Sequence, residues 1–216
     1  MVFITSYEKD YVTSNLHLWA TEIYNFAKDN GVSAVHFHDK HKSKATKDNV
    51  EKYLSKKNPK FVFISGHGDE EKVCGHKDEP IFIFNHNEHF LKNKIVYIVA
   101  CGSGEKLGYS IVDNGKAKAF IGYKKRFCMP YNEGRECTPL KNDLVTAIKE
   151  TSNAIPESII KGKTVNESIN SARIKGFKWR KDFQRRDPID KAETILWVLH
   201  YNISCLFPYG DLNASR

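Results

Sequence analysis

The sequence lacks the features that are typical of membrane, secreted, disulfide-rich and nucleotide-binding proteins. No apolar run approaches the ~20 residues of a membrane-spanning helix, and the start of the chain, MVFITSYEKDY, lacks the basic lead and long apolar stretch of a secretory signal. The five cysteines are odd in number and scattered, which does not predict a disulfide framework. No internal repeat, Walker motif or dinucleotide-binding fingerprint occurs. We therefore expect a cytoplasmic protein with no cofactor and no membrane contact.

The length of 216 residues suits one domain over residues 1–216. β-Branched and aromatic runs alternate with segments of helical period in residues 1–137, which predicts an α/β core with a mostly parallel sheet. Five strands are expected in this sheet, at 2–5, 33–38, 60–65, 94–100 and 118–123. Polar turn residues between two short strand-like runs predict a β-hairpin outside the sheet, within 72–84.

Helix boundaries follow from capping residues. The first helix is expected to have Ser14 as its N-cap and to end at Asn30-Gly31. Residues 138–216 are expected to be mostly helical, with one helix after Thr138-Pro139 and a second after a capping box of Thr164 and Glu167. A third helix is expected around ILWVLHY, at 195–201.

Two strand ends carry residues that can do chemistry. SGHG follows the third strand and ACGSG follows the fourth, which places His67 and Cys101 where each strand stops. In an open parallel sheet, ligands bind at the carboxyl ends of the strands. If these two strands are neighbours, His67 and Cys101 emerge at the same edge. The glycines beside them allow tight turns and leave backbone N–H groups uncovered.

A thiol and an imidazole at one edge predict nucleophilic catalysis. Cys101 is the expected nucleophile, and His67 can manage the proton delivered to the leaving group, because its charge is adjustable near neutral pH. The amides of Gly68 and Cys101 are candidates for an oxyanion hole. Gly122 and Tyr123, at the end of the fifth strand, are expected in the wall of the substrate cleft.

The order strand-HG, hairpin, helix, strand-AC, helix, strand resembles the caspase-like cysteine peptidases, which include caspases, metacaspases, separase, gingipains and bacterial CHAT domains. FVFISGHG and IVYIVACGSG carry the likeness. The resemblance implies a caspase-like fold with a flavodoxin-like strand order, flanked by helices, and it implies that His67 and Cys101 are catalytic. The end of the chain resembles the W...N...GD ending of gingipain-like and CHAT domains, through Trp197, Asn202, Gly210 and Asp211.

Departures from the family limit what the resemblance implies about substrate. Caspases favour Gln-Ala-Cys and a wider spacing from histidine to cysteine, whereas Val99 precedes Ala100 here. Metacaspases carry an acidic residue just before the cysteine, and Val99 occupies that neighbourhood here. Neither aspartate specificity nor the metacaspase preference for basic substrates is therefore expected. We expect a cysteine endopeptidase that acts on protein or peptide substrates, and a partner-controlled zymogen is possible.

The remaining cysteines and histidines have simpler interpretations. Four residues around the hairpin carry side chains that can bind a metal: Cys74, His76, His86 and His89. Their spacing matches no common zinc pattern, so we expect no metal site. His36 and His38 share one face of a strand and are interpreted as a polar strand edge.

Charge is concentrated in residues 161–191, which hold ten Lys/Arg and four acids. The segment that begins with Arg173 and ends with Arg186 could contact nucleic acid or an acidic protein, although most basic runs are a solvated helix face. Two alternatives to the peptidase stay open. One is a catalytically inactive caspase-like scaffold. The other is a subunit that binds nucleic acid or a regulatory partner through the basic segment.

Overall fold

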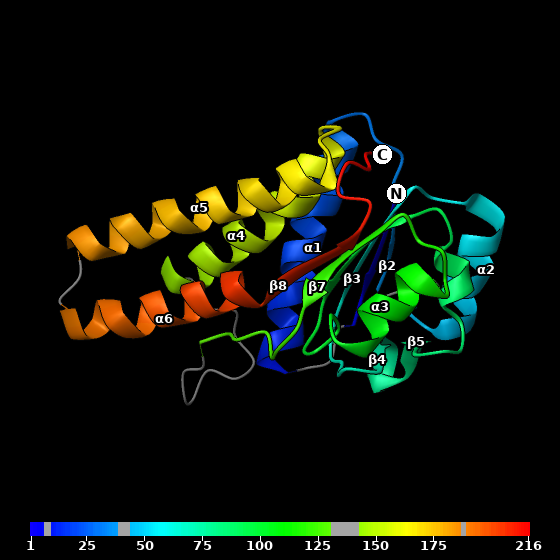
Figure 1. Cartoon of the computed structure of the whole chain (residues 1–216), viewed down its shortest axis with the longest axis horizontal. Coiled ribbons are helices and arrows are strands. Elements are labelled where there is room, and N and C mark those ends of the chain that lie inside the picture. Colours follow the sequence, from blue (N-terminus) through cyan, green and yellow to red (C-terminus); the bar gives the residue numbers. More distant parts are fainter. Residues whose placement is uncertain (7–9, 39–43, 131–142, 187–188) are drawn as a thin grey trace.

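The computed structural model has a six-stranded sheet at its centre, with the order β2-β1-β3-β6-β7-β8 (Figure 1). The structure describes residues 1–6, 10–38, 44–130, 143–186 and 189–216, and of residues 186 and 189–195 it describes the backbone only. The strands of this sheet are β1 (Val2–Thr5), β2 (Val35–Phe37), β3 (Phe61–Ser65), β6 (Ile95–Val99), β7 (Ala119–Tyr123) and β8 (Leu206–Gly210). The first five are parallel, in the order of flavodoxin-like sheets.

Helices cover both faces of the sheet. The helices are α1 (Tyr11–Asp29), α2 (Lys47–Lys57), α3 (Lys106–Asp113), α4 (Asp143–Ile160), α5 (Val165–Arg186) and α6 (Ile189–Cys205). Helices α1 and α4 lie on one face with α5 and α6 beyond them, and α2 and α3 lie on the other (Figure 1). The parallel strands are apolar on both faces because both are covered. Two hydrophobic clusters result, one on each side of the sheet.

The hairpin expected after the third strand is confirmed. β4 (Lys72–Cys74) and β5 (Pro80–Ile83) form a separate two-stranded antiparallel sheet. A short 3-10 helix, His76–Asp78, connects β4 to β5, and a second, Glu88–Leu91, lies between β5 and β6. The hairpin therefore lies between the end of β3 and the start of β6, and it begins at Lys72, five residues after His67.

The prediction that Ser14 caps the first helix is wrong. Asp10 is the N-cap of α1, and its carboxylate accepts hydrogen bonds from the amides of Val12 and Thr13. Ser14 is buried inside the helix. Aspartate and serine are both good caps. Asp10 is the cap here because the buried face of the helix begins at Tyr11, one turn before Ser14.

The described part of residues 138–216 is mostly helical, as expected, but Leu206–Gly210 form a sixth strand that the sequence did not predict. β8 pairs antiparallel with β7, so that Tyr123 lies opposite Leu206 and Ala119 opposite Gly210. Pro208 obscures the strand in the sequence, since proline cannot donate to a ladder. An edge strand such as β8 tolerates it.

Other expectations about this third are confirmed where the structure describes them. Thr164 and Glu167 form the capping box, with the Thr164 amide donating to Glu167 and the Glu167 amide donating to the Thr164 hydroxyl. The third helix is α6. The predicted start at Thr138-Pro139 lies outside the described residues. None of the helices in the described ranges combines the length and the apolar character that crossing a bilayer requires.

Candidate active site

Two neighbouring parallel strands, β3 and β6, carry His67 and Cys101 just beyond their carboxyl ends. Ser65 lies opposite Val99 in this strand pair, and the Gly66 amide donates to the Val99 carbonyl at 3.2 Å. His67 and Cys101 each come two residues later. The prediction that the two strands are neighbours is confirmed, and both residues leave the sheet at the same edge.

Both residues belong to the side of the sheet that α1 covers. Side chains alternate between the faces of a strand, and Phe63 and Val99 point into the core on the α1 side. Cys101 is half-buried and packs against the same core, while the His67 ring reaches Asp10 at the start of α1. No hydrogen bond joins the imidazole to the thiol among the described residues. Catalytic hydrogen bonds often tighten only when substrate is present.

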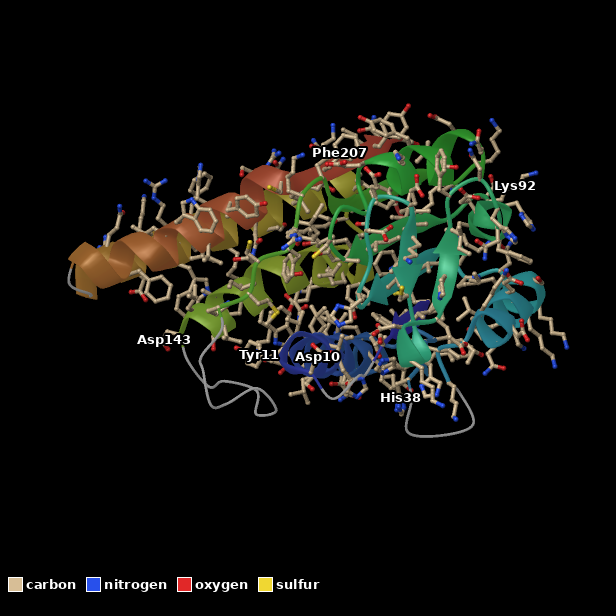
Figure 2. The ribbon with its side chains drawn as sticks, turned by 90° about the horizontal axis from the view of Figure 1, so that it is seen from below. Asp10, Tyr11, His38, Lys92, Asp143 and Phe207 are labelled. Carbon is tan, nitrogen blue, oxygen red and sulfur yellow. The ribbon has the colours of Figure 1, made fainter. Side chains whose placement is uncertain are left out.

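Asp10 is the residue that analysis of the sequence missed. One carboxylate oxygen accepts the amides of Val12 and Thr13 at 2.9 and 3.0 Å, and the other accepts the Thr13 hydroxyl. The second oxygen also lies 3.3 Å from Nε2 of His67. Figure 2 shows Asp10 and Tyr11 at the beginning of α1. Because Nε2 faces Asp10, Nδ1 is the ring nitrogen that does not take part in this contact.

The surroundings of Asp10 keep it ionised. Burial alone would raise its pKa, but the hydrogen bonds from Thr13, the charge of His67 and the amide of Val12 outweigh burial and hold the pKa below its usual value. Asp10 therefore presents a negative charge to His67 at neutral pH. The contact with this carboxylate limits the orientations of the His67 ring.

The turn after Cys101 brings the two loops of the site into contact. Gly102 has φ of +64°, a conformation that favours glycine, and its amide donates to the Lys125 carbonyl at 3.0 Å. A Cβ on Gly102 would lie 3.1 Å from the amide nitrogen of Glu70, in the loop that follows His67. The Ser103 hydroxyl donates to the Ala100 carbonyl at 3.2 Å and closes the turn. Gly102 therefore fixes the Cys101 loop against the His67 loop.

Gly68, expected as an oxyanion-hole donor, lies beside the start of the hairpin. It forms an isolated antiparallel bridge with Val73, but the hydrogen bonds of that bridge join Asp69 to Lys72 and Cys74 to His67. The amide of Gly68 lies on the opposite side of the chain from them and is not used by the bridge. A Cβ on Gly68 would lie 3.0 Å from the Ala100 side chain, so the Gly68 backbone passes close to the residue before Cys101.

Gly122 and Tyr123 contact the loop after Cys101, since the Gly104 amide donates to the Tyr123 carbonyl at 3.0 Å, but both residues are buried. Tyr123 is buried, and its hydroxyl lies 3.1 Å from the hydroxyl of Tyr97 in the core. A Cβ on Gly122 would meet the Phe120 ring at 2.4 Å. The chain reaches the exposed edge only after β7, with Lys125 and the residues that follow it.

Two further thiols lie near Cys101, and analysis of the sequence did not group them. Asn202 of α6 holds the backbone of Cys128 through two hydrogen bonds, of 2.9 Å to its amide and 2.7 Å to its carbonyl. The Cys205 carbonyl accepts the Lys124 amide at 2.9 Å. Burial, followed by the charges of Cys101 and Cys205, raises the pKa of Cys128. Cys205 directly precedes β8, so the unexpected pairing of β8 with β7 places Cys205 near the end of β7.

No group of three or more His, Cys, Asp or Glu side chains that could hold a metal occurs in the described ranges. Cys74, one of the four residues considered as metal ligands, is buried. His36 is more than a polar strand edge, because its ring stacks on His17 of α1 at 5.6 Å and lies 5.0 Å from His38. Burial, and then the charges of His17 and His38, lower the pKa of His36 to about 3. The Thr5 hydroxyl lies 2.9 Å from the His36 ring.

No protein-family model matches the chain, and no curated protein matches it either.

Proposed function

We propose that the chain is a cysteine endopeptidase of the caspase-like type, closest to the gingipain and CHAT-type domains. The two strand-end motifs support this proposal, together with the flavodoxin-like order of the parallel strands and the hairpin that follows the histidine. The strongest support is the register of β3 and β6, because it gives His67 and Cys101 matching positions at one edge. A thiol and an imidazole so placed can act on the two sides of one peptide bond.

In the acylation step, Sγ of Cys101 attacks the carbonyl carbon of the substrate as a thiolate. Negative charge develops on the carbonyl oxygen, and the amides of Gly68 and Cys101 stabilise it. When the C–N bond breaks, His67 gives its proton to the leaving amine. The products are a thioester on Cys101 and a released amine.

In the deacylation step, His67 acts as the base. It takes a proton from water while the water oxygen attacks the thioester carbonyl. The C–S bond breaks, the carboxylic acid product leaves, and Cys101 returns to its initial state. Asp10 contacts neither substrate nor thiol in this scheme. It is a positioning residue that holds Nε2 of His67 and favours the imidazolium formed during the cycle.

The test is cleavage of a diverse peptide library followed by mass spectrometry. Four proteins are compared: wild type, Cys101→Ala, His67→Ala and Cys128→Ala. The Cys128 variant is the matched control, because it removes a neighbouring thiol that the mechanism does not use. We expect cleavage by wild type and Cys128→Ala and none by the other two. Cleavage that persists in Cys101→Ala would contradict the proposal.

The inactive scaffold makes the opposite prediction for the thiol. In a scaffold with the same fold, Cys101 reacts with a peptidyl electrophile no faster than Cys128 or Cys205. The exposure of His67 and the contact of its ring with Asp10 favour the enzyme, since a scaffold has no need of an oriented imidazole at the edge.

A further inference from the structure

Helices α5 and α6 form an arm that extends beyond the sheet. Both helices run past the edge of the rest of the molecule (Figures 1 and 2). α5 packs on α4 through its buried side chains, and α6 closes against α5 at Gly176, where a Cβ would lie 2.3 Å from the tip of Ile203. The opposite face of α5 is directed away from both helices. It is exposed over several turns.

Large apolar side chains are exposed on this arm. Ile174 and Phe177 of α5 are 56% and 51% exposed, and Trp197 of α6 is 59% exposed. They are the three most exposed large hydrophobic residues that the structure describes. The Trp197 ring stacks on Tyr201 at 5.0 Å, which limits its motion. Exposed apolar residues that gather in one region are typical of interaction sites, and scattered ones are not.

Basic side chains are interleaved with these apolar ones. α5 carries seven Lys/Arg and two acids. Lys178, Lys181 and Arg185 are exposed and separated by three or four residues, so they lie on one face with Ile174 and Phe177. None of these three cations pairs with a carboxylate in the part of the chain that the structure describes. Lys175, on the side toward α4, does pair with Glu150 at 3.2 Å.

A hollow beside this face connects it with α6. Arg180, Leu196, Trp197 and His200 line the hollow. Tryptophan and arginine are the residues that most often carry the binding energy of protein interfaces. The arm therefore offers an apolar contact next to a row of unpaired cations.

We propose that this surface, defined as Ile174, Phe177, Lys178, Lys181, Arg185 and Trp197, binds an acidic amphipathic helix of a partner protein. A helix with apolar and Asp/Glu side chains at the same three- and four-residue spacings would cover the apolar residues and face the cations. A nucleic acid would satisfy the cations through its phosphates but would leave Ile174 uncovered, since an isoleucine offers no flat face on which a base can stack. This inference does not depend on the peptidase activity.

The experiment measures binding of the full chain to a fluorescein-labelled helical peptide of about 18 residues, five turns long, with leucine on one face and glutamate elsewhere. Three other probes are compared: the same peptide with glutamine for leucine, a peptide with lysine for glutamate, and an oligodeoxythymidine of similar length. We expect saturable binding of the Leu/Glu peptide, and binding of the other peptides that is weaker by about tenfold or more. Intrinsic fluorescence of Trp197 should shift to the blue on binding.

Variants locate the binding site. Two combined variants should each weaken peptide binding about tenfold or more. One carries Phe177→Ser and Trp197→Ser, and the other carries Lys178→Gln, Lys181→Gln and Arg185→Gln. These side chains are exposed, so the fold should be retained, as circular dichroism will verify. The matched control is Lys52→Gln, Lys56→Gln and Lys57→Gln on α2, which removes the same charge from another exposed helix face.

Four outcomes would overturn the inference. They are no saturable binding of the Leu/Glu peptide, equal binding by the Phe177 and Trp197 variant, an equal loss in the α2 control, and tighter binding of the oligonucleotide than of the peptide. The last outcome would assign the surface to nucleic acid.

Discussion

Replacement of Asp10 by asparagine separates the two roles that this residue has. Asparagine caps a helix about as well as aspartate, so Asp10→Asn keeps the hydrogen bonds to the amides of Val12 and Thr13. It removes the negative charge that lies 3.3 Å from Nε2 of His67. The variant therefore tests the electrostatic contribution to catalysis with little change to α1.

The exposure of the pair sets the expected magnitude. The His67 and Asp10 side chains are 46% and 38% exposed, so solvent screens their interaction. Exposed ion pairs contribute about 0.2–1 kcal/mol, which corresponds to a factor of about 1.4 to 5 in rate. Loss of the buried aspartate of a serine-protease triad costs about 10⁴ instead. We expect the smaller effect, a decrease in kcat/KM of about 1.4- to fivefold.

The assay is the rate of cleavage of the best peptide from the library, measured together with urea unfolding. Asp10→Asn should unfold within about 0.5 kcal/mol of wild type, whereas Asp10→Ala should lose about 0.5–2 kcal/mol because the cap is removed. Asp48→Asn is the control, since Asp48 is an exposed aspartate in the first turn of α2. A wild-type rate in Asp10→Asn, or a loss of about a thousandfold or more, would refute the reasoning.

Three other predictions concern the framework of the site. The pKa of His36 is lowered to about 3 in the folded chain, so the unfolded chain protonates His36 at a higher pH than the folded chain does. The free energy of unfolding should therefore fall as the pH falls from about 6.5 toward 3, by at most about 1.4 kcal/mol per pH unit. Urea unfolding at several pH values should show a weaker dependence of this free energy on pH in His36→Gln than in wild type, and an equal dependence would contradict the prediction. Gly102→Ala should destabilise the chain more than Gly31→Ala. Both glycines have positive φ, where a side chain costs about 1–2 kcal/mol, but only at Gly102 would the new Cβ also meet a neighbouring loop. Equal losses of stability on thermal unfolding would show that the Cys101 and His67 loops are not in contact. Tyr97→Phe should cost about 1–2 kcal/mol in urea unfolding, because the Tyr97 hydroxyl lies 2.8 Å from the hydroxyl of Ser152 inside the core; a variant as stable as wild type would contradict the buried contact.

The sequence contains a strong signal for the two strand ends of the site. FVFIS and IVYIV are apolar throughout, which predicts strands covered on both faces, and a glycine beside His67 and another after Cys101 mark the turns. The alternation of strands and helices predicts a parallel sheet, although a hairpin separates these two strands in the sequence and their being neighbours was a condition of the prediction. The position of both residues at one edge could be predicted because it depends only on topology.

The features that could not be predicted depend on contacts between distant parts of the chain. Asp10 and His67 are 57 residues apart, and no local pattern links an N-cap to a histidine at a strand end. The approach of Cys128 and Cys205 to Cys101 requires β8, and Pro208 hides that strand. The exposure of Trp197 could not be predicted from the sequence either, because an aromatic residue in a helical pattern is more often part of a core.

The most direct measurement of the central claim compares the thiols within one molecule. Wild type and His67→Ala are treated with substoichiometric iodoacetamide at neutral pH, and mass spectrometry gives the alkylation rates of Cys101, Cys128 and Cys205. The account predicts that in wild type Cys101 is alkylated several times faster than Cys128 and Cys205. In His67→Ala, Cys101 should be alkylated at the same rate as Cys128 and Cys205. Equal rates in wild type, or a fast Cys101 that does not depend on His67, would contradict it.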